Sequence, residues 1–286
     1  LNEYDFFFLL EPKDVFQAPE VVMVYSGQGF GEMSRNFHKL YRTRLVRGKY
    51  RDEARPILVN NWEGTYFDFD EAKILGIAKE AKELGIELMV LDDGWFGKRN
   101  SDTCSLGDWY VNKEKLPNGI IGLARKVNDL GLKFGLWFEP EMVSVDSDLY
   151  RAHPDWCIYV PDRIRTETRN QLTLDLSRKE VCDYIVEAVG KILDEANIAY
   201  VKWDMNRNMS ELGSQGLPAD RQKEMSHRYM LGLYNTMERV ISAHPNVLFE
   251  GCSGGGGRFD PGMLYYMPQI WTSDDTDAVE RLYIQY

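Results

Sequence analysis

Apolar runs and amphipathic stretches alternate along the chain from Arg55 onward. Strands buried on both faces of a parallel sheet read as nearly continuous apolar runs, and runs of that kind recur here, each finishing near acids or tryptophans. We therefore predict seven strands, at 56–63, 86–95, 132–141, 171–177, 199–206, 246–254 and 268–275.

The stretches between these runs predict helices. In 70–85, apolar residues recur at helical spacing from Ile74 to Leu84, while Asp70 can cap the first turn and Gly85 can end the last. Similar patterns predict further helices over 122–131, 178–196 and 221–241.

Strands that alternate with helices in this way predict an α/β fold with a parallel sheet. Seven strands are one short of a closed barrel, so we predict a (β/α)8 TIM-type barrel over residues 51–286 that is truncated before its eighth strand. A Rossmann fold is disfavoured because no glycine-rich dinucleotide turn follows the first strand.

Residues 1–50 have a different pattern. The segments 4–10 and 21–26 predict short strands, and 31–48 predicts a helix with basic residues. We interpret this region as the end of an N-terminal β-domain followed by a linking helix. The chain opens on Leu1 and shows no signal-peptide pattern, so we expect a fragment of a cytoplasmic protein.

Composition excludes several classes of function. The formal net charge of −11 argues against a nucleic-acid partner, because phosphate binding needs a basic face. The four cysteines form no disulfide pattern, and the four histidines lack the spacing of metal ligands. No apolar run reaches the ~18 residues of a membrane span. We expect no cofactor, no metal ion and no membrane association.

Acidic residues and tryptophans gather at the ends of the predicted strands. Carboxyl ends of parallel barrel strands share one mouth, where active sites lie. Carboxylates accept hydrogen bonds from hydroxyl groups, and flat rings cover the apolar faces of sugars. Each residue alone could instead be a helix cap or a core side chain, but the set favours a sugar site. The acids are Glu63, Asp92, Asp93, Glu139, Glu141, Asp175, Asp204, Glu250, Asp274 and Asp275, and the tryptophans are Trp62, Trp95, Trp137, Trp203 and Trp271.

Side-chain alternation places Lys202, Asp204 and Asn206 on one face of their strand, opposite Trp203. Burying those three polar groups beneath helices would be costly, so we expect them to face the mouth. The alternative is a structural Lys–Asp pair inside the barrel. Hydrolysis of a glycosidic bond commonly uses two carboxylates, and two strand-end aspartates could supply both.

The glycine-rich run 251–258 follows the sixth predicted strand. Close approach of its backbone to a ligand, with Cys252 and Gly254 at the edge, is the simplest interpretation. A phosphate-binding loop is an alternative, although the G-K-[ST] ending of a P-loop is absent. Cys252 as a thiol nucleophile is a further, weaker alternative, because no histidine pattern accompanies it.

Six motifs together resemble the bacterial α-galactosidases of glycoside hydrolase family 36. They are LDDGWFG (91–97), GLWFEPE (135–141), LDLS (174–177), VKWDMNR (201–207), EGCSGGGGRFD (250–260) and WTSDDTDA (271–278). The resemblance implies a retaining, double-displacement hydrolysis of terminal α-galactosyl groups, as in melibiose, raffinose and stachyose. It also implies that the family's large N-terminal β-domain, eighth strand and C-terminal β-domain are missing here, and that the full-length parent is a homo-oligomer.

The resemblance also implies roles for individual residues. Asp204 would be the nucleophile and Asp274 the acid/base. Asp92 and Asp93 would bind the O4 and O6 hydroxyls of galactose, Arg169 and Lys202 would reach O3 and O4, and Trp62 and Trp137 would wall the pocket. Asn206, Cys252 and Gly254 would line its floor near O2.

Rival functions remain open at this point. An α-N-acetylgalactosaminidase or a galactosyltransferase would belong to the same class of enzyme. A non-catalytic galactoside-binding barrel would have no reason to keep both Asp204 and Asp274. A metal-dependent barrel lyase is disfavoured because histidine ligand spacing is missing.

Overall fold

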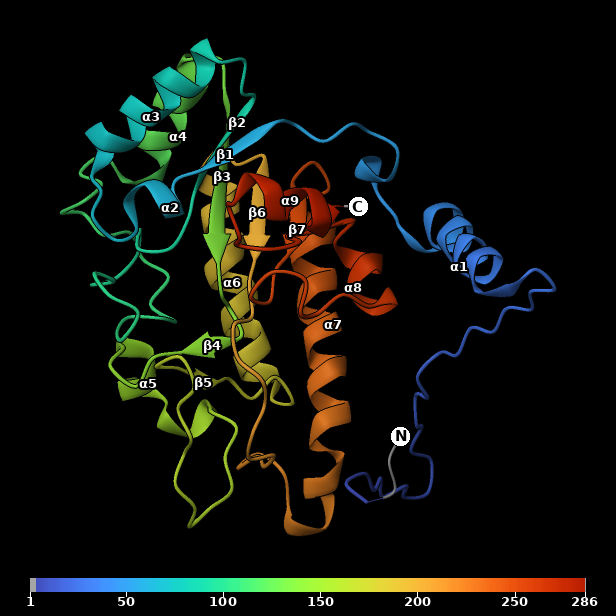
Figure 1. The fold of residues 1–286 in the computed structure, drawn as a ribbon. Helices are drawn as coiled ribbons and strands as arrows, with labels where there is room; N and C mark the ends of the chain where they lie inside the picture. The colour runs from blue at the N-terminus through green and yellow to red at the C-terminus, as the bar shows by residue number, and fades with distance from the viewer. Residues whose placement is uncertain (1–3, 286) are drawn as a thin grey trace.

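A curled parallel sheet of six strands forms the centre of the molecule, whose computed structural model describes residues 4–285 (Figure 1). Neighbouring strands pair in the order β1-β2-β3-β6-β7-β8, and every pair is parallel. The strands are β1 (Leu58–Asn60), β2 (Leu88–Leu91), β3 (Lys133–Phe138), β6 (Tyr200–Trp203), β7 (Leu248–Gly251) and β8 (Gln269–Ile270). Six of the seven predicted strands are therefore confirmed within this sheet.

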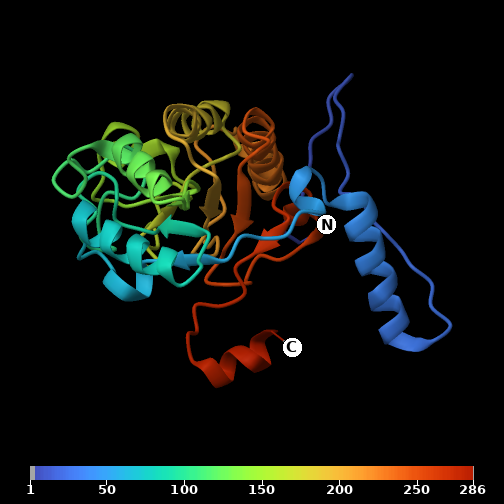
Figure 2. The same cartoon turned by 90° about the horizontal axis from the view of Figure 1, so that it is seen from above.

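Helices cover the outer side of the curled sheet, as the view from above shows (Figure 2). The four predicted between strands are confirmed as α3 (Glu71–Glu83), α4 (Gly119–Asp129), α6 (Lys179–Glu195) and α7 (Met225–Ala243). In α3 the carboxylate of Asp70 accepts the backbone N–H of Lys73 at 2.8 Å, as its capping position predicts. Gly85, with φ of +82°, follows the end of the same helix, where a left-handed residue favours glycine.

Alternate residues of the strands pack into two cores. Met89 and Leu91 of β2 belong to the large apolar cluster beneath the helices. Leu88 and Val90 of the same strand belong to a smaller cluster with Tyr200, on the other face of the sheet. Because side chains of a strand point alternately to its two faces, this division also fixes which residues at the strand ends turn toward the mouth.

The segment 171–177, the fourth of the seven predicted strands, does not join the parallel sheet, which corrects that prediction. Its strand β5 (Leu172–Thr173) pairs antiparallel with β4 (Met142–Val143), and β3 pairs directly with β6. Gln171, Thr173 and Asp175 alternate with core leucines, so one face of the segment is polar. Gln171 donates to Glu139, and Asp175 accepts from Ser214 and Ser177. The backbone N–H groups of Leu174 and Asp175 donate to the carbonyls of Glu141 and Trp156, so the backbone of this segment is paired outside the parallel sheet.

The N-terminal region departs from the prediction in part. The helix predicted over 31–48 is confirmed as α1 (Gly29–Leu40), continued by a π-helical turn over Tyr41–Leu45. The strands predicted at 4–10 and 21–26 are wrong, because these segments run extended without a ladder partner among the described residues. A strand forms only where a neighbour accepts its backbone hydrogen bonds. Phe6, Phe8 and Phe16 instead pack around His227 at the start of α7.

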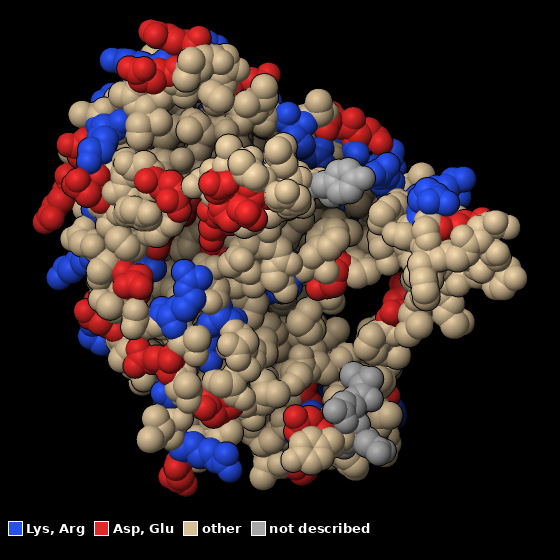
Figure 3. Space-filling view, viewed as in Figure 1, with Lys and Arg blue, Asp and Glu red and all other residues tan. Residues whose placement is uncertain are grey.

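Shorter elements complete the fold. These are 3-10 turns at Lys49–Arg51, Pro154–Trp156 and Ala219–Glu224, with helices α2 (Trp62–Thr65), α5 (Asp148–Ala152), α8 (Pro261–Tyr266) and α9 (Ala278–Gln285). Acidic and basic side chains are interspersed over the face seen in Figure 3. Over residues 4–285 no helix is both long and apolar enough to span a membrane.

Candidate active site

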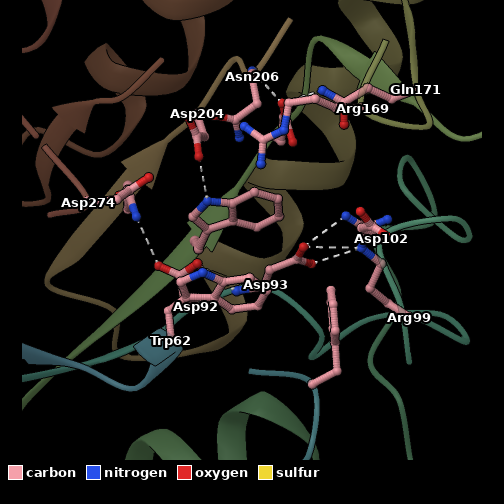
Figure 4. A pocket seen from close by; sticks show the side chains of 14 residues that line it. Trp62, Asp92, Asp93, Arg99, Asp102, Arg169, Gln171, Asp204, Asn206 and Asp274 are labelled. Atoms are coloured by element: carbon pink, nitrogen blue, oxygen red, sulfur yellow. Dashed lines mark hydrogen bonds and ion pairs between the residues drawn. The ribbon is translucent and has the colours of Figure 1, made fainter. Parts of the chain in front are cut away.

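A pocket opens at the carboxyl ends of the parallel strands, about 660 Å³ in volume with its mouth included. That size lies within the range of small-molecule sites. Every residue to which the family resemblance gives a role lines it, except Cys252 and Gly254 (Figure 4). The wider set of strand-end acids and tryptophans was assigned to the mouth only in part correctly: Trp95, Trp203, Glu141, Asp175 and Glu250 are buried outside this lining, and Glu63, Trp271 and Asp275 do not belong to it either. The lining consists of Trp62, Phe67, Asp92, Asp93, Arg99, Asp102, Trp137, Glu139, Arg169, Gln171, Lys202, Asp204, Asn206 and Asp274.

Asp204 directly follows β6 and is fixed from two sides. Its Oδ2 accepts the indole N–H of Trp137 at 3.0 Å, and its Oδ1 accepts the backbone N–H of Met205 at 3.0 Å. Trp137 lies opposite Lys202 in the β3–β6 register, so strand pairing brings the indole to this carboxylate. These two hydrogen bonds hold the side chain of Asp204 in one orientation. The residue is also buried, with only 5% of its surface exposed.

Asp274 lies four residues beyond β8 and reaches the same pocket from an exposed loop. Its Oδ1 accepts the indole N–H of Trp271 at 2.8 Å. The two aspartates thus differ in environment, one enclosed beside the strands and one open to solvent. Figure 4 shows both labelled side chains at the same cavity.

Two adjacent carboxylates after β2 are each paired with a cation. Lys202 Nζ lies 3.1 Å from Asp92 Oδ2, and Arg99 donates to both carboxylate oxygens of Asp93 at 2.8 to 3.2 Å. Asn60 donates to Asp92 as well. Burial raises the pKa of Asp93, and Arg99 opposes that shift. A bidentate guanidinium fixes the plane of a carboxylate, so Asp93 is held ready for hydroxyl donors.

Lys202 faces the pocket, as side-chain alternation predicts, and Trp203 points into the core. Burial alone would lower the pKa of Lys202, but Asp92 and, more weakly, Asp204 outweigh it and hold the pKa above its usual value. The ammonium group also lies 4.7 Å from the centre of the Trp271 ring. Lys202 is therefore both a buried ion-pair partner and part of the pocket wall.

Arg169 stands apart from the other cations of the pocket. Residues 4–285 give its guanidinium neither an ion pair nor a hydrogen bond. Its backbone and that of Asn170 adopt positive φ, +54° and +58°. Residues other than glycine rarely adopt this conformation, and such strain clusters at functional sites. An exposed, unpartnered cation in the pocket is available to a ligand.

The structure adds five lining residues to those that had an assigned role: Phe67, Arg99, Asp102, Glu139 and Gln171. Glu139 was among the strand-end acids that were expected at the mouth, and its place there is confirmed, but no role was assigned to it. Gln171 is the first polar residue of a run that alternates with leucines, and this alternation could have predicted that its side chain points away from the core. Arg99 and Asp102 belong to an irregular loop after β2, where no periodicity indicates direction.

Cys252 and Gly254 lie behind the lining residues. The Gly254 N–H donates to Asn206 Oδ1 at 2.9 Å, and Cys252 N–H donates to the Trp203 carbonyl. Burial, followed by the charge of Asp204, raises the pKa of the Cys252 thiol. A thiol held protonated in this way is a poor nucleophile, which disfavours cysteine chemistry.

The backbone N–H groups of the glycine-rich run donate to carbonyl oxygens of the run itself and of the loop after β8. Ser253 N–H donates to Gly255 O, Gly257 N–H to Ser253 O, and Gly256 N–H to Thr272 O. A Cβ on Gly255 would lie 3.0 Å from the Thr272 carbonyl oxygen, and its φ is +87°. Glycine is required there for close approach to the loop that carries Asp274, and these amides are not free to bind phosphate.

The fold and the pocket together define an α/β protein with a site of carboxylates, cations and tryptophans at the ends of its parallel strands. No group of three or more histidine, cysteine or acidic side chains in the described part of the chain is arranged to hold a metal ion. The chain belongs to the Melibiase family, whose profile matches residues 15–286.

Two curated relatives illustrate the similarity. Alpha-galactosidase AgaA of Geobacillus stearothermophilus is 66% identical over 286 residues, and alpha-galactosidase Mel36A of Lactobacillus acidophilus is 56% identical. Each alignment covers 100% of this chain and 39% of the relative, so the chain spans about two fifths of their length. Crystal structures of AgaA variants in complex with raffinose and with stachyose both superpose with a TM-score of 0.96, at 66% identity, over 100% of this chain and 40% of theirs.

Proposed function

We propose that the protein is a retaining α-galactosidase that hydrolyses terminal α-D-galactosyl groups of melibiose, raffinose and stachyose. The observation that carries the proposal is that Asp204 and Asp274 line one pocket with two tryptophans and the Asp92–Asp93 pair. Relatives named as alpha-galactosidases, and the complexes of AgaA variants with raffinose and stachyose, support the choice of substrate.

Double displacement assigns one task to each aspartate. In the first step an oxygen of Asp204 bonds to the anomeric carbon, the bond to the leaving oxygen breaks, and Asp274 donates a proton to that oxygen. In the second step Asp274 takes a proton from water, which attacks the anomeric carbon and releases Asp204. The fixed orientation of Asp204 suits attack along one direction. The open setting of Asp274 suits exchange of protons with water and with leaving groups.

The polar wall would recognise the galactosyl group. In this proposal Asp92 and Asp93 accept hydrogen bonds from O4 and O6, while Arg169 and Lys202 donate to O3 and O4. Carboxyl groups held in place by paired cations can accept hydrogen bonds from sugar hydroxyls, and Arg169 has no other partner among residues 4–285.

The remaining assignments concern the walls and the floor. Trp62 and Trp137 would cover the apolar faces of the sugar. Asn206 would contact O2, with Cys252 and Gly254 beneath it.

We further propose that residues 51–286 belong to a (β/α)8 catalytic barrel, which residues 1–50 link to a preceding β-domain. β1 and β8 are the edge strands of a curled sheet, and closing a barrel removes such edges. Val15, Met23, Tyr25 and Phe30 are largely exposed, so they are available to contact a further domain or a second subunit of a homo-oligomer. A cytoplasmic location is part of the same proposal, because the four cysteines are unpaired.

The assignment of Asp204 is tested by replacing it with alanine in the full-length chain. We expect turnover of nitrophenyl α-galactoside to be abolished, because no oxygen remains to attack the anomeric carbon. Azide should restore cleavage and give the β-galactosyl azide, since a small anion enters from the vacated face. An azide product with retained configuration, followed by NMR, would contradict the assignment.

The assignment of Asp274 is tested by Asp274→Ala with a series of leaving groups. The first step should slow least for substrates whose leaving oxygen needs no proton, because only the acid has been lost. Pre-steady-state rates with dinitrophenyl galactoside and melibiose provide the comparison. Equal losses for both substrates would remove the acid role.

A further inference from the structure

Glu139 is a buried carboxyl group in the pocket that has no cation beside it. It directly follows β3, lines the cavity and is 2% exposed. Among residues 4–285 no lysine, arginine or histidine nitrogen lies within ion-pair distance of its oxygens. Arg99 donates from Nε and Nη2 to Asp93 and from Nη1 to the Cys104 carbonyl, so its guanidinium is engaged elsewhere. An ionised carboxylate without a cation is costly to bury.

The hydrogen bonds of Glu139 fall on one oxygen. Its Oε1 accepts the backbone N–H of Asn206 at 2.6 Å and the side-chain amide of Gln171 at 2.8 Å. Asn206 in turn accepts the N–H of Gly254. One carboxyl group therefore ties the segment after β3 to those around β5 and after β6, and Asn206 extends the chain to the loop after β7. Asp204 lies only two residues before the anchored amide.

Glu141, two residues further along the chain, is a buried carboxyl group with a cationic partner, and its contacts differ from those of Glu139. It is fully buried, and Arg258 contacts both of its oxygens at 2.8 and 3.0 Å, while Tyr229 and Trp203 donate to it as well. Burial alone would raise the pKa of Glu141, but Arg258 and these donors lower it. Glu139 has only two neutral donors on a single oxygen, which leaves Oε2 free to carry a proton.

We propose that Glu139 is a positioning residue of the reaction, which anchors Asn206 and Gln171 beside Asp204 and does so as the neutral acid. The proposal rests on the function proposed above. The charged groups that face Glu139 are Asp204, from the end of β6, and Arg99, from the loop after β2. Arg169 and Lys202 line other parts of the same pocket.

The electrostatic setting agrees with this geometry. Burial, followed by the charge of Asp204, raises the pKa of Glu139 to about 8, against weaker opposition from Asn206, Gln171 and Arg99. Ionisation at alkaline pH would place a second unpaired charge next to Asp204. The 204–206 segment would then have to move or admit water, and the first chemical step would slow.

Loss of the Asp274 proton would also lower activity at alkaline pH, and this decline in the pH–rate profile, its alkaline limb, would mask the contribution of Glu139. An Asp274→Ala background removes that limb, and dinitrophenyl galactoside needs no acid in the first step. In full-length D274A, we expect the glycosylation rate to retain an alkaline limb with a midpoint near pH 8. In the double variant D274A/E139Q that limb should disappear, because the amide is neutral at every pH.

The anchoring role separates two single variants. Glu139→Gln keeps an oxygen that can accept both hydrogen bonds, so kcat should stay within about threefold of wild type in acid. Glu139→Ala removes the anchor and should lower kcat by about tenfold or more, because the catalytic segment loses its position. E141Q is the matched control: it leaves the buried Arg258 without its counter-ion, and the Tm should fall far more than in E139Q.

A direct readout is the infrared carbonyl band of a protonated carboxyl group. The wild-type minus E139Q difference spectrum should contain this band at neutral pH, and the band should titrate away near pH 8. In D204A the midpoint should move to lower pH, since a neighbouring charge is gone. Absence of the band at neutral pH, or an identical alkaline limb in D274A and D274A/E139Q, would overturn the proposal. A wild-type protein that cleaves no galactoside but shows the band would defeat the proposed function and leave the neutral acid standing.

Discussion

At the scale of single residues, the environment of a carboxyl group decides its charge in this molecule. Asp93 and Glu141 have bidentate arginines, Asp92 has a lysine, and Glu139 has two neutral donors. These acids lie within a short distance along the chain or across the sheet, yet the pKa of Glu141 is lowered whereas those of Asp93 and Glu139 are raised. Groups whose environments push their pKa values apart in this way are the usual basis of acid and base assignments.

Glu139 should make stability depend on pH. Its pKa rises from 4.5 to about 8 on folding, so between these values the folded chain binds a proton that the unfolded chain has released. The stabilisation is complete below the unfolded pKa and is lost as pH rises through the folded value, by up to ~1.4 kcal/mol per pH unit. The unfolding free energy of E139Q minus that of wild type should therefore increase as the pH rises from about 5 to 8.

Denaturant unfolding of both proteins across this pH range measures the difference. Glu83→Gln, at the exposed end of α3, is the control, and its difference from wild type should stay flat. A flat difference for E139Q as well would mean that Glu139 has the same charge in the folded and unfolded chains.

Side-chain alternation gave the direction of Lys202, Asp204 and Asn206 correctly, because a strand has only two faces. It could not choose between a structural ion pair and a pocket wall, and Lys202 serves both purposes. Arg99 was missed because its direction depends on an irregular loop after β2. The charge state of Glu139 depends on which cations are already engaged elsewhere, and no local pattern encodes that.

At the scale of elements, Gly232 lets α7 pack tightly on the segment that follows β5. A Cβ at this position would overlap the carbonyl oxygen of Leu176 and lie 3.2 Å from Cys182 Sγ in α6. We expect Gly232→Ala to destabilise the protein by about 1–3 kcal/mol through overpacking.

Gly190 provides the matched control in the neighbouring helix. A Cβ there meets nothing within 4 Å, so Gly190→Ala should stabilise α6 by about 0.5–1 kcal/mol. Thermal unfolding of the two variants compares the effects. Similar Tm values for G232A and G190A would show that α7 does not depend on this close contact.

The helices between strands were predicted well, because periodicity, the Asp70 cap and the terminal glycines all indicate the same boundaries. The segment 171–177 has a strand pattern and does form a strand, but with β4 in place of the parallel sheet. Periodicity identifies an extended segment without naming its neighbour. The choice of partner depends on the hydrogen bonds that Gln171 and Asp175 make to distant loops.

At the scale of the whole molecule, residues 4–28 are attached to the barrel by few backbone contacts. Leu9 N–H donates to the Glu224 side chain, and Arg221 and Lys223 donate to the backbone carbonyls of Leu9 and Tyr4. Figure 1 shows this segment and α1 running beside the main body, away from the sheet. Aromatic packing around His227 and ion pairs of Arg221 with Glu11 and Asp14 complete its attachment.

Hydrogen exchange should show this difference in the 286-residue chain. Amides of 15–28 should exchange orders of magnitude faster than those of β2, whose backbone is paired on both sides and fully buried. Mass spectrometry of peptides from both regions measures the contrast. Protection of 15–28 equal to that of β2 would mean that this segment pairs with a partner in solution.

Because β3 pairs directly with β6, the sheet does not depend on the chain between them, although part of that chain forms the pocket wall. Residues 159–170 lie outside the ladder, yet they deliver Arg169 to the cavity. The length of this loop can therefore vary, or the loop can be replaced by one from another protein, while the strands keep their register. Laboratory evolution confined to those twelve positions would vary which ligands the mouth admits and leave Asp204 and Asp274 in place.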